Sequence, residues 1–276
     1  MIGIHTNWTK PYKVNIGGEY RAEDFELFTT VLSVLKWKEK NGPIVLYADK
    51  TALEYYKKTG IIRLYSDVKE LNVDCEINPN MFWAAGKLFA LREQRAPAAV
   101  IDTDFIVWDS ILFDKLGECT VIHFEDLYPD VYPPAETFDM RKEYVLPDFN
   151  MSLKACNTAF YVIKSQKLAQ AYTESAIEFM KNANRSEDRL RYMVFAEQRM
   201  LNMCADKLGI EIRAFSNLER LYQDGYGFFT HVWGMKQQMR ENASLRKSFC
   251  RRCADRIKHD YPQYSDLADK ILTGSI

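Results

Sequence analysis

Short apolar segments alternate with segments of helical periodicity along most of the chain, and this alternation limits the fold more than any other feature. Over residues 24–40, apolar side chains recur at three- and four-residue steps, which predicts a long helix. Alternating strands and helices are typical of an α/β fold with a largely parallel sheet. We expect strands at residues 2–5, 44–47, 61–65, 98–101, 119–124, 158–163 and 210–214, and further helices at 51–58, at 81–94, after Ser165 and at 189–208.

The length and charge of the chain limit its class. Its 276 residues suit a large α/β domain, and a formal net charge of −1 gives no reason to expect nucleic-acid binding. No apolar run approaches the roughly 20 residues that span a bilayer, and the first residues lack the pattern of a signal peptide. We therefore expect a cytoplasmic protein, free or peripheral at the membrane, with no transmembrane segment.

An acidic pair, Asp102 and Asp104, carries the most specific chemical signal. Thr103 separates the two carboxylates, and apolar runs lie on both sides, at 98–101 and 105–108. Uncompensated negative charge at the end of a buried strand is costly, and a divalent cation bound to a diphosphate would balance it. The pair therefore predicts a metal-dependent site for a nucleotide sugar. The alternative is a strand-end turn with two solvated or capping carboxylates.

His231 is the residue that we expect to complete a metal site with the two aspartates. Gly234 follows and would let the backbone approach a phosphate, whose charge Lys236 could neutralise. A hydrogen-bonded core histidine is the alternative interpretation of His231.

Glu197 lies on the predicted apolar stripe of helix 189–208, together with Leu190, Met193, Val194, Leu201, Cys204 and Leu208. A carboxylate on an inward face needs a partner or a chemical task. Either Glu197 and Gln198 lie near a reacting sugar, or Glu197 is a buried residue hydrogen-bonded to the backbone or to an arginine.

Three further features are weaker. Asn157, at a strand edge, could bind sugar hydroxyls or serve as a turn residue. Lys87 lies off the predicted apolar face of its helix, where it could reach a phosphate or be a solvated lysine. The lone pair Cys250 and Cys253 lacks the second half of a zinc site, so we interpret that segment as a basic helix.

Taken together, these motifs resemble the glycosyltransferases of the GT-A fold, in particular the glycogenin-like and lipopolysaccharide galactosyltransferase-like families, and bacterial proteins with a GT-A-like pattern are more similar still. The segment 100–104 is similar to their DxD motif. Lys87 stands where those families often have arginine, and Asn157 begins a segment similar to their Asn-x-Gly, with Ala159 in place of glycine. Glu197-Gln198 and the segment 231–236 follow in the same order.

The resemblance implies a site for a nucleotide-diphosphate sugar. Asp102, Asp104 and His231 would hold Mn²⁺ or Mg²⁺, and Lys236 and Lys87 would face the diphosphate. Thr6, Trp8 and Asp49, after the first two strands, would face the nucleotide. The proline-rich loop 125–150 would shape the acceptor pocket, for a glycan, a lipid-linked or a small-molecule acceptor. Residues 1–236 would form the catalytic domain, and 237–276 a helical extension packed on it.

The general base and the class of reaction stay open at this point. An inverting enzyme needs a carboxylate base, for which Glu197, Asp126 and Asp148 are candidates, whereas in a retaining enzyme Glu197 and Gln198 would contact the donor sugar. One alternative is a haloacid dehalogenase-type phosphatase with Asp102 as nucleophile. A second is a non-catalytic module with the GT-A fold that binds nucleotides or sugars.

Overall fold

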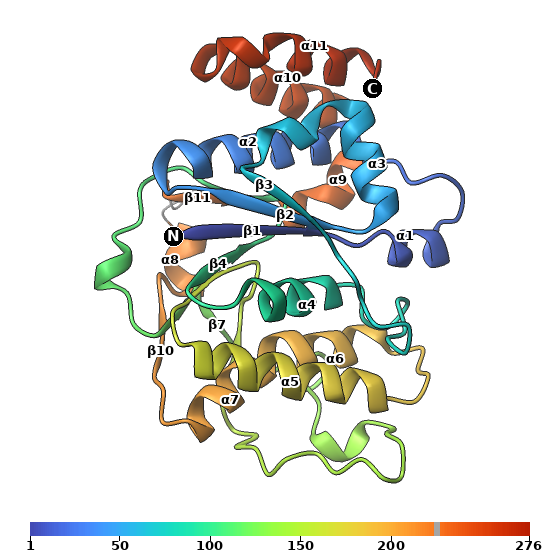
Figure 1. The fold of residues 1–276 in the computed structure, drawn as a ribbon, viewed down its shortest axis with the longest axis vertical. Helices are drawn as coiled ribbons and strands as arrows, with labels where there is room; N and C mark the ends of the chain where they lie inside the picture. Colours follow the sequence, from blue (N-terminus) through green and yellow to red (C-terminus); the bar gives the residue numbers. More distant parts are fainter. Residues whose placement is uncertain (224–226) are drawn as a thin grey trace.

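A computed structural model of the chain describes residues 1–223 and 227–276, without the side chains of 222 and 223. Its centre is a seven-stranded sheet with strand order β10-β6-β9-β4-β1-β2-β3 (Figure 1). Only β9 runs antiparallel to its neighbours, β4 and β6, so the predicted α/β fold with a mostly parallel sheet is confirmed. The strands are β1 (Ile2–Asn7), β2 (Ile44–Ala48), β3 (Asp67–Glu70), β4 (Ala98–Ile101), β6 (Cys119–Val121), β9 (Phe160–Ile163) and β10 (Ile212–Ala214).

Helices cover both faces of this sheet (Figure 1). One face carries α4 (Ala85–Gln94), α5 (Gln166–Asn182), α6 (Arg189–Val194) and α7 (Met200–Lys207), and the other carries α2 (Asp24–Lys40), α3 (Lys50–Thr59), α10 (Ala243–Asp260) and α11 (Ser265–Thr273). Alternate residues of one strand enter opposite cores, as strand geometry requires: Val45 packs with the first group, Ile44 and Leu46 with the second. The C-terminal helices therefore share a core with α2.

Shorter elements connect the layers. Two strands, β5 (Phe105–Val107) and β11 (Phe229–His231), pair as an antiparallel ribbon, and β7 (Phe124–Glu125) pairs with β8 (Ala155–Cys156). The remaining helices are α1 (Lys10–Asn15), α8 (Leu218–Gln223) and α9 (Lys236–Glu241). Short 3₁₀ turns occur at Ile61–Leu64, Phe113–Lys115, Ala135–Thr137, Trp233–Met235 and Pro262–Tyr264. None of the described helices combines the length and apolarity that a bilayer crossing requires.

The predicted helix at 24–40 and the cap at Ser165 are confirmed, since α2 has those bounds and the Ser165 side chain accepts a hydrogen bond from the Leu168 amide. The strand predicted at 61–65 is wrong. Ile61 and Leu64 are buried one 3₁₀ turn apart, and the third strand is the polar edge strand β3 instead. An edge strand needs backbone pairing on one side only, so β3 lacks the apolar signal that the prediction used.

Two other predicted elements are divided. The strand expected at 119–124 ends as β6 at Val121, and β7 belongs to a different small sheet. The helix expected at 189–208 contains a π-helical segment, Phe195–Arg199, between α6 and α7. Leu190, predicted on the buried stripe, is 47% exposed; it lies in the first turn of α6, where Met193 and Val194 are buried and Leu190 is not.

A buried histidine links three elements beneath the strand ends. His5, on β1, lies 3.0 Å from the Tyr65 hydroxyl through Nδ1 and 3.0 Å from Ser33 Oγ through Nε2. Ser33, on α2, donates its hydroxyl hydrogen to the Phe105 carbonyl at 2.5 Å, so Nε2 must carry the proton that Ser33 Oγ accepts. Neutral imidazole therefore satisfies every group in this chain of hydrogen bonds.

Burial lowers the pKa of His5 to about 3, although Asp104 acts to raise it. Below about pH 6.5, His5 binds a proton in the unfolded chain but not in the folded protein. The unfolding free energy therefore falls by up to about 1.4 kcal/mol for each pH unit between pH 6.5 and pH 3. Between pH 7 and pH 5, we expect the unfolding free energy measured in urea to fall less in His5→Gln than in the unmodified protein. The control is His259→Gln at an exposed position, and an equal loss in all three proteins would contradict the assignment.

Candidate functional site

The fold brings the acidic pair next to His231. After β4 ends, the Asp102 amide donates to the Ala159 carbonyl at 2.8 Å, and the Phe105 amide donates to the Asp102 carbonyl at 2.9 Å, which closes a turn. The chain then continues as β5, whose partner β11 places His231 opposite Phe105. The Val232 amide donates to the Asp104 carbonyl at 3.1 Å, so this backbone pairing fixes the imidazole beside the carboxylates.

Asp102, Asp104 and His231 form a candidate metal site. One ligand atom from each residue lies within 4.8 Å of the other two, and no other group of three potential ligands gathers in this way among the described residues. Nε2 of His231 is 3.8 Å from Oδ1 of Asp104, whose side chain is buried. Two carboxylates and an imidazole are suitable donors for Mn²⁺ or Mg²⁺, so these residues fit such an ion.

Two lysines contact the same carboxylates. The Lys87 amino group lies 2.6 Å from Oδ1 of Asp102 and 2.6 Å from Oε1 of Glu197, and the Lys236 amino group lies 2.8 Å from Oδ2 of Asp104. Each lysine contacts one oxygen of its aspartate. The lysine contacts thus involve Oδ1 of Asp102 and Oδ2 of Asp104, and Oδ1 of Asp104 is the oxygen nearer to His231.

Lys87 corrects the sequence prediction, because it is buried rather than solvated. Every residue from Ala85 to Leu91 in α4 is buried, since this helix lies between the sheet and α5. Gly86 permits the close approach, because a Cβ atom there would lie 3.1 Å from Leu71 Cδ2 and 3.3 Å from Trp8 Cβ. The helix thus carries the Lys87 amino group to the carboxyl ends of the strands.

The protonation states suit a metal site at neutral pH. Burial lowers the pKa of His231 to about 4 against the opposing effect of Asp104, so the ring is neutral and can donate a lone pair. Burial acts to raise the pKa of Asp104, but Lys236 and His231 outweigh it and hold this pKa below its ordinary value. Burial raises the pKa of Asp102 to about 7, although Lys87 acts to lower it. An added cation would favour the ionised form of Asp102.

Glu197 lies on the inward face, as predicted, and its partner is Lys87. It belongs to the π-helical segment, and its carbonyl accepts a hydrogen bond from the buried Tyr172 hydroxyl at 2.5 Å. Burial acts to lower the pKa of Lys87, but Asp102 and Glu197 raise it well above its ordinary value. Lys87 is therefore a permanent cation between two carboxylates.

The other predicted residues lie around this cluster with partners of their own. Asp49 caps α3 by accepting from the Ala52 amide, and it also accepts from the Thr9 amide and hydroxyl. Asn157 donates to Oε1 of Glu125 at 2.9 Å, and Gln198 accepts from the Tyr132 hydroxyl at 2.6 Å. These contacts give Asp49, Asn157 and Gln198 a structural function whether or not they also bind a ligand.

Exposure separates the remaining candidates. Asp126 is exposed and pairs with Lys154 at 2.6 Å, and Asp148 is also exposed. Gly234 is exposed with open space around it. Thr6 and Thr103 are half-buried, and Trp8 is buried beside α4.

His123 and Glu125, two residues near Asn157, were not among the residues predicted from the sequence. His123 is buried, and its Nε2 lies 3.0 Å from Oε1 of Glu125, although neither ring nitrogen makes a hydrogen bond of normal geometry. A charge on His123 would lower the pKa of His231, so the two rings share one electrostatic environment. In the sequence, His123 directly follows the mostly apolar segment 119–122 and is one of four histidines in the chain, and this is the signal that could have identified it.

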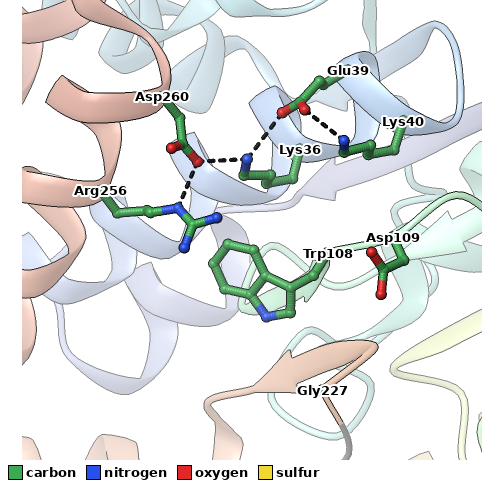
Figure 2. Close-up of a pocket in the computed structure, with 8 residues that line it drawn as sticks. All are labelled: Lys36, Glu39, Lys40, Trp108, Asp109, Gly227, Arg256 and Asp260. Atoms are coloured by element: carbon green, nitrogen blue, oxygen red, sulfur yellow. Dashed lines mark hydrogen bonds and ion pairs between the residues drawn. The ribbon is translucent and has the colours of Figure 1, made fainter.

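A cavity of about 640 Å³ lies at the other end of the β5–β11 ribbon (Figure 2). Trp108 follows β5 there, and Lys36 joins Glu39 and Asp260 at 2.9 and 2.6 Å. Its lining residues are Lys36, Glu39, Lys40, Trp108, Asp109, Gly227, Arg256 and Asp260. None of them belongs to the acidic cluster, so the candidate metal site is defined by its side chains and not by this cavity.

Replacing Lys87 tests how strongly the cluster depends on buried charge. We expect Lys87→Met to lower the unfolding free energy by about 3–5 kcal/mol, because Asp102 and Glu197 would lose their shared cation. Lys154→Met is the matched control, since it breaks a pair of the same 2.6 Å length whose side chains are 59% and 54% exposed. That control should cost at most about 1 kcal/mol. Equal losses in urea unfolding of the two variants would contradict the argument.

Comparison with known proteins gives a family without an assigned activity. A search of curated proteins finds no significant match. Residues 1–271 match a protein-family model described as "Family of unknown function (DUF6734)". Because that match covers nearly the whole chain, the protein belongs to the family DUF6734.

Proposed function

We propose that this protein is a metal-dependent glycosyltransferase of the GT-A type, which transfers a sugar from a nucleotide-diphosphate donor. The observation that carries the proposal is the meeting of Asp102, Asp104 and His231 at the carboxyl end of β4, with two lysines beside them. Ligands of open α/β sheets bind outside the carboxyl ends of the strands, which is where this cluster lies.

Each residue has a separate task in this proposal. Asp102, Asp104 and His231 would hold Mn²⁺ or Mg²⁺, and the ion would supply Lewis-acid stabilisation of the leaving diphosphate. Lys236 approaches the site from α9, where a phosphate oxygen could replace part of its contact with Asp104. The acceptor hydroxyl oxygen would form a bond to the anomeric carbon as the bond from that carbon to the diphosphate oxygen breaks. The diphosphate would leave with the electron pair, and the hydroxyl proton would pass to a carboxylate base or to the leaving diphosphate.

Glu197 is a weak candidate for a general base. Its carboxylate is buried and paired with Lys87 at 2.6 Å, so Lys87 already occupies one of its oxygens. The geometry therefore favours a role for Lys87 and Glu197 in shaping the donor-sugar side of the cluster. Asp126 and Asp148, which are both exposed, remain candidates on the acceptor side.

Metal binding is the first test. Loss of a residue that hydrogen-bonds to a metal ligand weakens metal binding roughly 10- to 100-fold. Asp104 would be a ligand itself, so we expect Asp104→Asn to weaken Mn²⁺ binding by more than that. Isothermal titration calorimetry would measure it, with Asp126→Asn as the control, because Asp126 is exposed and paired elsewhere. Equal Mn²⁺ affinity in the unmodified protein and in Asp104→Asn would exclude this metal site.

Donor binding is the second test. Nucleotide-diphosphate sugars of uridine, guanosine, cytidine and thymidine should raise the melting temperature of the protein only when Mn²⁺ is also present. A donor concentration of 100 times its Kd would stabilise the folded protein by about 2.7 kcal/mol. Mn²⁺-dependent hydrolysis of the same donor, lost in Asp104→Asn, would support a transferase. Binding without hydrolysis would favour a non-catalytic module, and a trapped phosphoaspartate at Asp102 would favour a phosphatase. No shift with any donor would count against the proposal.

A further inference from the structure

The segment that carries His231 and Lys236 depends on tertiary contacts for its position. Its helix α9 has six residues, too few to be stable alone, and a 3₁₀ turn precedes it. Val232 and Met239 are both fully buried and anchor its apolar side. On its polar side, Lys236 pairs with Asp104, and Arg240, in the last turn of α9, pairs with α2.

Arg240 pairs with the first turn of α2. Its Nε donates to Oε1 of Glu23 at 2.6 Å, its Nη2 lies 3.4 Å from Oε1 of Glu26, and its guanidinium lies 5.8 Å from the centre of the Phe25 ring. Glu23 and Glu26 also form the capping box that begins α2. The orientation of α9 is thereby tied to a well-ordered helix of the core.

Glu26 acts on Lys236 as well. Burial acts to lower the pKa of Lys236, but Asp104 and, more weakly, Glu26 and Asp102 raise it. Lys236 and Arg240 are four residues apart and therefore lie on the same face of α9. The Arg240 guanidinium lies 3.4 Å from Glu26, so its loss would leave the charge of Glu26 to compete with Asp104 for Lys236.

We propose that Arg240 is a positioning residue, which fixes α9 on α2 and keeps Glu26 from drawing the Lys236 amino group away from Asp104. This inference rests on the proposed function, because its consequence is measured on the binding of a diphosphate. The pair of Arg240 with Glu23 is half-exposed, so it contributes little to stability. Its effect should therefore appear in ligand binding and not in folding.

The test uses the full-length protein with Mn²⁺ alone and with Mn²⁺ plus inorganic pyrophosphate, measured by titration calorimetry. We expect Arg240→Gln to weaken pyrophosphate binding about tenfold, since a small misplacement of a charged group has effects of this size. Mn²⁺ affinity should change less. Arg240→Lys should retain most of the binding, and Glu26→Gln combined with Arg240→Gln should recover it, because the competing carboxylate is gone while glutamine still serves the capping box.

Arg246→Gln is the matched control. Arg246 pairs with Glu23 and Asp24, both at 2.7 Å, but it lies on α10 and not on α9. We expect pyrophosphate binding to be unchanged in this variant. Equal losses in the Arg240 and Arg246 variants, normal binding in Arg240→Gln, or no recovery in the double variant would overturn the role of Arg240. Failure of the unmodified protein to bind Mn²⁺ and pyrophosphate would instead overturn the proposed function, and this inference with it.

Discussion

Buried charge at the carboxyl end of β4 is the constraint on which the rest of the site depends. Asp102, Asp104 and Glu197 bring three carboxylates together, and Lys87 and Lys236 bring two ammonium groups. His231 adds no charge at neutral pH. With all three carboxylates ionised, these five groups carry a net charge of −1. Burial, helped by the charges of Asp104 and Glu197, raises the pKa of Asp102 although Lys87 acts to lower it. A bound divalent cation would reverse the sign of this net charge, and an anionic diphosphate would then compensate the cation.

Close backbone packing makes this charge cluster possible. Gly86 lets α4 lie against β1, so that Lys87 enters at the strand ends, and the β5–β11 ribbon brings in His231 by main-chain hydrogen bonds. The hydrogen-bond chain from His5 through Ser33 to the Phe105 carbonyl connects the turn after Asp104 to β1 and α2. The groups of the site therefore belong to elements whose positions the core sets.

The sequence predicted those parts of the fold and site that depend on local pattern. Helix 24–40 has apolar residues at three- and four-residue steps, and the aspartate pair lies between two apolar runs, so both were visible. Lys87 was misjudged because α4 is buried on nearly all sides, which a helical stripe cannot reveal. The strand predicted at 61–65 was wrong because periodicity alone does not identify a short, largely apolar run as a strand. In the 3₁₀ turn, Ile61 and Leu64, three residues apart, are both buried. Arg240 was invisible because its partners Glu23 and Glu26 lie more than 200 positions away.

Lys87 and Lys236 differ in how strongly the surrounding residues hold them, and this difference bears on function. Lys87, on a core helix, is held between the half-buried carboxylate of Asp102 and the buried carboxylate of Glu197, so it can move only if the cluster is disrupted. Lys236 belongs to a short helix, is less deeply buried and contacts a single carboxylate. A ligand that brings its own negative charge can therefore recruit Lys236 at small cost, whereas Lys87 must stay where it is. In the proposed transferase, Lys87 would set the geometry of the metal site, and Lys236 would respond to the arrival of the diphosphate.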